Sequence, residues 1–172
     1  MTFQTPRGLS AHEAPETFIS AMAGAATQVS IVTTDGRAGR FGVTVSAFSS
    51  VSAEPPLVLV CINRRSPAIA AIEANDAFCV NLLDDTQAHI ANCFAGRPGD
   101  IAPYDFACAD WNAARTGAPV LTGAVANFDC TVESAHDAGT HRIFIGRVQA
   151  ALAEPRTPLA FSNRSYQALR PL

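Results

Sequence analysis

The chain has 172 residues, of which 48% are hydrophobic and 16% are charged, and its net charge is −3. Such a length suits one domain with its own apolar core. The slightly acidic balance and the absence of Lys argue against a nucleic-acid-binding protein, because phosphate neutralisation needs clustered basic side chains. The low charge content also predicts that a partner subunit covers part of the surface.

The cysteines and the apolar runs predict a cytoplasmic protein. Five cysteines occur without any Cys-x-x-Cys pair, and Cys61, Cys79 and Cys130 lie within apolar runs, as buried free thiols of a reducing compartment do. No apolar run approaches the ~18 residues that a membrane span requires. The N-terminal stretch lacks the basic and apolar regions of a secretory signal. We therefore expect no membrane contact.

The first half of the chain alternates helices and strands after an N-terminal arm over 1–14, and a single domain is predicted over 15–172. Phe18, Ile19 and Met22 have helical spacing, which predicts a helix over 15–24. Ser66 followed by Pro67 is a typical helix start. The predicted strands cover 29–34, 42–48, 56–63 and 77–84, a Gly-rich turn covers 35–42, and two further helices cover 66–75 and 86–96.

The second half is dominated by strands. Residues 97–119 have no clear period, and irregular segments of this length are usually functional or form an interface. Strand follows strand over 120–154, with a turn predicted at 136–139. Few helices and locally paired strands favour a mainly β fold, a closed or partly closed antiparallel barrel with a few peripheral helices, over a doubly wound sheet.

Common nucleotide and catalytic motifs are missing. Gly36, Gly39 and Gly42 form G-x-x-G-x-x-G rather than the Rossmann pattern, and there is neither a P-loop Lys nor a G-x-S-x-G elbow. His136 and His141 flank the predicted turn and could bind a metal, but no third ligand stands nearby in the sequence. We therefore expect no metal site.

The segment from 42 to 57 contains an unusual group of small hydroxyl residues, which are Ser46, Ser49, Ser50 and Ser52. Short donors and backbone N–H groups in one concavity suit a planar heterocycle with carbonyl acceptors, or a phosphate. A polar crossover between two strands would have the same composition. The residues alone leave both interpretations open.

Several motifs in order resemble the short-chain NAD(P)H:flavin oxidoreductases, the reductase components of two-component flavin-dependent monooxygenases. The first is GVTVSAFSSVSAEPPLVLV, and the others are FCVNLL (78–83), FAGR (94–97), GTHRIFIGRV (139–148) and PLAF (158–161) followed by Arg164 and Tyr166. The resemblance covers about residues 15–169. Thr140 departs from the family pattern, in which Asp is commoner, and this departure predicts a looser orientation of the following histidine.

The resemblance implies an antiparallel split β-barrel, a homodimer, and the reduction of FMN or FAD by NADH or NADPH. The reduced flavin would diffuse to a partner monooxygenase. One alternative is a flavin-dependent reductase of a corrinoid or another bound acceptor. Another is a flavin-binding carrier or sensor without turnover.

The resemblance also implies site residues. His141 would orient the nicotinamide as the catalytic residue, although a solvated turn histidine is the simpler interpretation. The 44–52 loop would line the isoalloxazine, with Ser46 and Ser49 as donors to its developing negative charge. Ser66 at a helix start would bind phosphate with its neighbours. The implied cofactor-binding residues are Val43, Thr44, Val45, Ser46, Ser49, Ser50, Asn63, Arg64, Ser66, Asn81, Arg97 and Tyr166.

Overall fold

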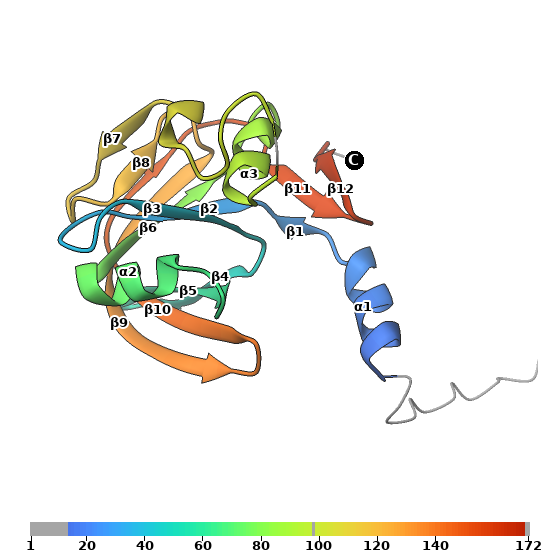
Figure 1. Ribbon diagram of the computed structural model, residues 1–172, viewed down its shortest axis with the longest axis horizontal. Helices are drawn as coiled ribbons and strands as arrows, with labels where there is room; N and C mark the ends of the chain where they lie inside the picture. Colours follow the sequence, from blue (N-terminus) through green and yellow to red (C-terminus); the bar gives the residue numbers. More distant parts are fainter. Residues whose placement is uncertain (1–13, 98, 171–172) are drawn as a thin grey trace, which may run out of the picture.

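The computed structural model describes residues 14–97 and 99–170, with side-chain burial from residue 16 onward. Within these residues the fold is mainly antiparallel β-sheet with three peripheral α-helices (Figure 1), which confirms the mainly β prediction. The helices are α1 (Ala14–Gly24), α2 (Ala68–Asn75) and α3 (Ala88–Phe94), and η1 (Phe106–Cys108) is a short 3-10 helix. Apart from Ala14, the predicted arm over 1–14 lies outside the described residues.

The strands of the described residues fall into three sheets. A seven-stranded sheet has the order β3-β2-β6-β9-β10-β5-β4, a three-stranded sheet the order β1-β11-β12, and β7 pairs with β8 alone. The strand bounds are β1 (Thr27–Gln28), β2 (Ser30–Thr34), β3 (Phe41–Val45), β4 (Phe48–Ala53), β5 (Pro56–Asn63), β6 (Ala77–Leu82), β7 (Trp111–Ala113), β8 (Pro119–Leu121), β9 (Ala126–Ala138), β10 (His141–Ala153), β11 (Leu159–Ser162) and β12 (Ser165–Ala168).

The seven-stranded sheet curls back on itself. Its two edge strands, β3 and β4, are separated in the chain only by Ser46 and Ala47, so opposite edges of the sheet must meet at that turn. The backbone N–H of Cys61 on β5 donates to the carbonyl of Ala47 at 3.0 Å and fixes the turn there. β3 and β4 are not hydrogen-bonded to each other, so the curled sheet is a barrel that is split between these two strands, as predicted.

Two apolar clusters explain the burial of the central strands. One lies within the curl and includes Val60, Phe78 and Phe144; the other lies outside it and includes Ile31 and Phe94. Every residue of β2 and β6 is buried, because these strands have a cluster on each face. Their sequences, SIVTT and AFCVNL, accordingly lack the alternation of apolar and polar residues that is typical of a strand with one exposed face.

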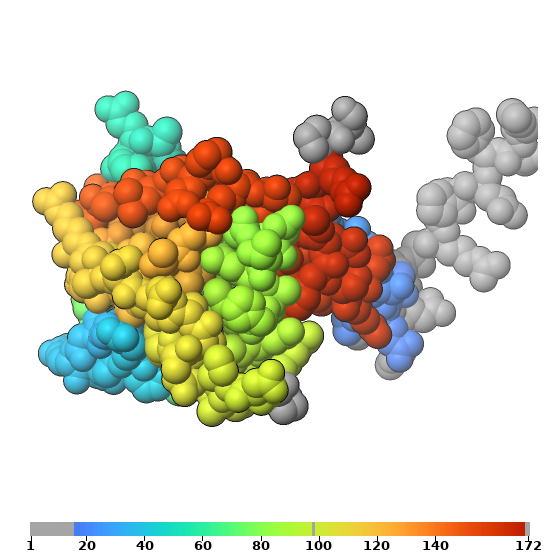
Figure 2. All heavy atoms as spheres, turned by 90° about the horizontal axis from the view of Figure 1, so that it is seen from above, coloured from blue at the N-terminus to red at the C-terminus, as the bar shows by residue number. Residues whose placement is uncertain are grey.

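Helix α3 lies over the outer face of the sheet. Figure 2 shows it, in green, between the yellow β7–β8 region and the red β11–β12 region. Gly42 on β3 permits this close approach, since a Cβ at that position would lie 2.5 Å from Cε1 of Phe94. The helix is therefore packed against the strand that leads into the hydroxyl-rich segment.

Three details differ from the sequence prediction. Residues 49–52, expected to belong to the 44–52 loop, form part of β4, because edge pairing with β5 satisfies their backbone even though most of their side chains are exposed. The irregular 97–119 segment contains η1, β7 and most of the short β7–β8 hairpin. The β9–β10 turn consists of Gly139 and Thr140, so it begins three residues later than the predicted turn over 136–139. Gly139 adopts φ 57° there.

Candidate functional site: a cleft at the barrel opening

A cleft of about 160 Å³ opens where β3, α3 and β12 meet, and we call it the ring cleft. Its lining combines apolar and aromatic side chains with a few polar ones, which is typical of a site for a planar ring. The lining residues are Val29, Thr44, Val45, Ser46, Ala95, Arg97, Phe161 and Tyr166. Five of the predicted cofactor-binding residues, distant in sequence, therefore meet in one place.

Two walls of the ring cleft are tied to α3. The Thr44 hydroxyl donates to the carbonyl of Ala91 at 2.7 Å, so it anchors β3 to the helix and does not point into the cleft as a free donor. On the opposite wall the Tyr166 hydroxyl donates to Oδ1 of Asn92 at 3.0 Å. Burial raises the pKa of Tyr166 above its ordinary value, while nearby Arg97 lowers it in part, so the phenol remains a donor at neutral pH.

A second, more open hollow of about 510 Å³ lies beside the β9–β10 turn, and we call it the turn groove. Its lining residues are Asn63, Arg64, Arg65, Gly139 and Thr140. The backbone N–H of Arg64 donates to the carbonyl of Thr140 at 3.0 Å, which closes the groove on the β5 side. Three cationic or amide side chains around one hollow could bind an anion.

His141 stands at the edge of the turn groove. It is the register partner of Asn63 across the β10–β5 ladder. Its Nδ1 lies 3.0 Å from the Thr140 hydroxyl, so the residue that departs from the family pattern still offers the imidazole a hydrogen-bonding partner. A hydroxyl is a neutral partner where Asp would be a charged one, so the looser orientation of His141 stays a prediction.

Asp137 forms ion pairs with two arginines beside the turn groove. Asp137 accepts a hydrogen bond from Arg142 at 2.8 Å and lies 3.5 Å from Arg64. The hydrogen bond from Arg142 holds the pKa of Asp137 below its ordinary value, and the charges of Arg64 and Arg142 act in the same direction. Arg142 also pairs with Glu73 on α2. Arg64 therefore has one exposed carboxylate as a partner and keeps its side chain 54% exposed.

The Ser46–Ala47 turn connects the two hollows. Ser46 lines the ring cleft, and Ala47 accepts from the N–H of Cys61, two residues before Asn63 in the turn groove. This backbone hydrogen bond therefore links the turn that carries Ser46 to the strand that carries Asn63.

Five of the predicted cofactor-binding residues line neither hollow. Val43 packs against the inner apolar cluster, and Ser49 and Ser50 are exposed on β4, where the Ser49 hydroxyl donates to the carbonyl of Ser50 at 3.1 Å. Helix α2 begins at Ala68 rather than at residue 66, so Ser66 is not its N-cap, although its hydroxyl accepts from the Ala68 N–H at 3.3 Å. Ser66 nevertheless stays close to the turn groove, since its N–H donates to the carbonyl of Asn63.

Asn81 has a different role from the predicted one. Its side chain is fully buried and bonds to Ile31, Thr33, Leu121 and Asn127, which joins β6 to β2, β8 and β9. Because its amide oxygen and nitrogen are satisfied inside the protein, Asn81 has no surface to present to a cofactor. The prediction that it binds one disagrees with this position.

Sequence reasoning missed Val29, Ala95, Phe161 and Asn92. Ala95 and Phe161 stand inside the FAGR and PLAF motifs, so the resemblance did contain a signal for them. Val29 lies between β1 and β2 and carries no mark beyond its apolar side chain. Asn92 lies on a helix and resembles an ordinary polar surface residue until α3 is placed beside β12.

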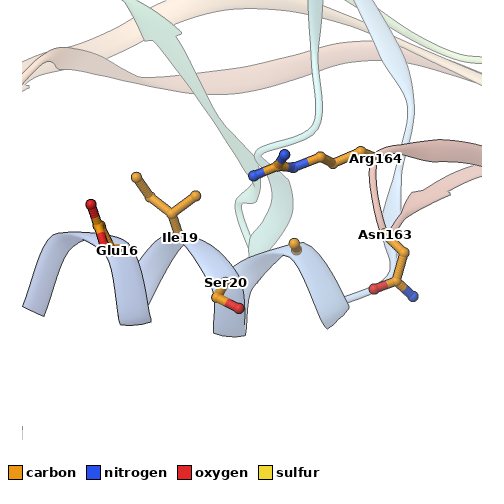
Figure 3. A pocket seen from close by; sticks show the side chains of 6 residues that line it. Glu16, Ile19, Ser20, Asn163 and Arg164 are labelled. Carbon is orange, nitrogen blue, oxygen red and sulfur yellow. The ribbon is translucent and has the colours of Figure 1, made fainter. Parts of the chain in front are cut away.

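Other hollows and clusters lie outside this site. A groove of about 450 Å³ separates α1 from the β11–β12 turn, and Arg164 extends from that turn across the helix (Figure 3). Within residues 14–97 and 99–170, no group of three or more His, Cys, Asp or Glu side chains is placed to hold a metal ion. In the same residues, no helix has the length and apolar character needed to cross a membrane.

Comparisons with known proteins agree with this geometry. An FMN reductase (NADH) RutF 2 of Methylorubrum extorquens is 43% identical over 151 residues, which cover 87% of this chain and 86% of that protein. Two solved structures superpose closely. A nitrilotriacetate monooxygenase component B homologue from Mycobacterium thermoresistibile has a TM-score of 0.83 at 33% identity, and covers 94% of this chain and 89% of its own.

The second structure is the NADH:FAD oxidoreductase SgcE6 of Streptomyces globisporus in complex with NAD and FAD fragments. It has a TM-score of 0.82 at 29% identity and covers 95% of this chain and 98% of its own. The family model of the flavin reductase like domain matches residues 22–170, which include both the ring cleft and the turn groove. The chain therefore belongs to the flavin reductase-like family.

Proposed function

We propose that the protein is an NADH-dependent flavin reductase that binds FMN in the ring cleft. The observation that carries the proposal is the convergence of Thr44, Val45, Ser46, Arg97 and Tyr166 on one cleft in a chain of this family. An apolar, aromatic-walled cleft suits an isoalloxazine. The cationic turn groove beside it suits the anionic chain of the flavin.

NADH is the proposed hydride donor, and His141 is the proposed contact for its nicotinamide. Support comes from a relative named FMN reductase (NADH) and from the SgcE6 complex with NAD and FAD fragments. Hydride transfer needs no nucleophile in the protein; it needs the two rings held in contact and water kept away. The position of His141 opposite Asn63, at the edge of the turn groove, supports this role.

The test is NADH oxidation by the purified protein, measured with and without added flavin. The expected result is oxidation that requires flavin, with FMN, FAD and riboflavin compared at equal concentration. A tightly bound flavin that NADH does not bleach would favour a carrier or sensor instead. Failure of all three flavins to support NADH oxidation would contradict the proposed activity.

A homodimer is the proposed assembly. Helix α1 stands away from the rest of the fold (Figure 1), and three of its large apolar side chains are exposed, with Phe18 at 63%, Ile19 at 55% and Met22 at 50%. An exposed apolar stripe of this kind favours a protein partner. The N–H of Asn163 donates to the carbonyl of Ala23, so α1 is attached to the hairpin that carries Tyr166. A second copy on α1 would lie near the ring cleft.

Light scattering tests this assembly. The wild-type protein is expected to have twice the 18.0 kDa chain mass. Replacing Phe18, Ile19 and Met22 together by Ser is expected to yield a monomer. Leu152→Ser, which removes an equally exposed apolar side chain on β10, is the matched control and should leave the dimer intact. A wild-type monomer, or a dimer that survives the triple substitution, would contradict the role of α1.

A flavin-dependent monooxygenase is the proposed partner, reached by diffusion of reduced flavin. The structural neighbour named as a monooxygenase component B homologue supports this. We place the protein in the cytoplasm, because its five cysteines are all free and four of them are buried.

A further inference from the structure

Asn92 occupies a junction that neither the motifs nor the ring-cleft lining includes. Its amide Oδ1 accepts two hydrogen bonds, one from Nη1 of Arg97 at 3.1 Å and one from the Tyr166 hydroxyl at 3.0 Å. Both donors belong to side chains that line the ring cleft. One neutral oxygen therefore orients two neighbouring parts of the same wall.

The backbone brings Arg97 back to this oxygen. Gly96 adopts φ 71° after α3, and the chain reverses so that the N–H of Arg97 donates to the carbonyl of Asn92 at 3.0 Å and that of Gly96 to Cys93 at 3.1 Å. These two bonds form a Schellman motif, which requires a residue that tolerates a positive φ. Arg97 is thus held to Asn92 by both its backbone and its side chain.

The two hydrogen bonds to Asn92 also determine how Arg97 lies relative to Tyr166. The Arg97 guanidinium carbon lies 6.0 Å from the centre of the Tyr166 ring, at the outer limit of a cation–π contact, so the aromatic ring alone does not hold it firmly. Arg97 has no ion pair among the described residues. The Asn92 amide orients its guanidinium without neutralising its charge.

We propose that Asn92 is a positioning residue for flavin binding, which holds Tyr166 and Arg97 against the ring cleft and leaves the positive charge of Arg97 available to the anionic chain of FMN. This inference rests on the proposed function of the ring cleft. A carboxylate at the same position would hold both side chains equally well, but it would cancel that charge.

Two substitutions separate geometry from charge. Asn92→Leu has a similar volume and removes both acceptor bonds, whereas Asn92→Asp keeps the acceptor and adds a negative charge. Flavin dissociation constants are measured by quenching of flavin fluorescence, which requires no turnover, with FMN and riboflavin as the probes. Riboflavin has the ring but no phosphate, so it reports the geometry alone.

Asn92→Leu should raise the dissociation constants of both flavins about five- to tenfold, because the amide oxygen loses one neutral bond from the Tyr166 hydroxyl and one bond from the charged Arg97 guanidinium. Asn92→Asp should leave riboflavin binding within about twofold of wild type and weaken FMN binding about three- to tenfold. Asn112→Leu, which removes an exposed asparagine bonded to Thr122 outside the site, is the matched control.

A double-mutant cycle checks the contact itself. Tyr166→Phe should weaken riboflavin binding less than Asn92→Leu does, and it should add little in the Asn92→Leu background because the shared bond is already absent. Melting temperatures show whether any variant is unfolded. Unchanged flavin binding in folded Asn92→Leu would overturn the inference, and so would equal riboflavin binding in the Leu and Asp variants. Neither outcome would contradict the proposed reductase activity. Absence of flavin binding and of turnover in the wild type would overturn both proposals.

Discussion

Asn63 and His141 are register partners on β5 and β10, seventy-eight positions apart in the numbering, and this pairing places the histidine at the edge of the turn groove. The histidine that was expected to act on the nicotinamide is therefore a neighbour of the residues expected to bind phosphate.

Replacing His141 by Ala should reduce kcat/KM for NADH by about several-fold to a hundred-fold, since a polar contact to the substrate is lost, and more strongly if it is made in the transition state. The flavin dissociation constant should change much less, because the ring cleft does not include His141. Steady-state kinetics with NADH varied at saturating FMN measures the first effect. His136→Ala, an exposed histidine on β9, is the control. Equal losses in NADH use and in flavin affinity would remove the distinct role of His141.

Replacing Arg64 by Ala should raise the KM for FMN about three- to tenfold and leave the KM for riboflavin nearly unchanged, because only FMN carries a phosphate for the turn groove. The effect should diminish at high salt, since the side chain is half exposed. Arg147→Ala is the matched control, because that exposed arginine pairs with Glu133 and lines neither hollow. A similar change for both flavins would show that Arg64 acts on the fold rather than on phosphate.

Replacing Thr44 by Val should lower the free energy of unfolding by about 0.5–1.5 kcal/mol, because the hydroxyl loses its bond to the Ala91 carbonyl. The flavin KM should rise as well, since α3 carries Asn92 and leads directly into Arg97. Thr44→Ser keeps the hydroxyl and should restore most of both properties. Denaturant unfolding and flavin titration on the same preparations make the comparison. Full stability in Thr44→Val would show that α3 is held by its apolar packing alone.

Among the five thiols, Cys61 should be modified first in the native protein. Burial raises the pKa of Cys108 and Cys130 to about 12, so their reactive thiolate is scarce at pH 8, and it raises the pKa of Cys79 further. The pKa of Cys61 is also raised by burial, but this is the only one of the five that is not fully buried. Alkylation followed by mass spectrometry at pH 8 gives the order. Early modification of Cys108 would indicate that the segment around η1 opens in solution.

Much of the fold follows from local patterns in the sequence. Strand β5 has the predicted bounds, 56–63, and helix α1 begins one residue earlier than predicted. Both elements were predictable because their apolar spacing and flanking breakers are strong local signals. The edge strand β4 escaped prediction because its stability comes from pairing with β5, and its polar, exposed side chains carry no alternation that marks a strand.

The chemistry of the site divides in the same way. Ordered motifs were sufficient to indicate the family and to mark Ser46, Tyr166 and Arg97 as candidates that the fold then brings to one cleft. The sequence could not show that the Thr44 hydroxyl donates to a carbonyl of α3, or that the Asn81 side chain is buried in the fold. It also could not show that Asn92 accepts hydrogen bonds from both Arg97 and Tyr166. The identity of a side chain determines which bonds it can make, whereas only the packing of distant strands and helices decides which partner lies within reach.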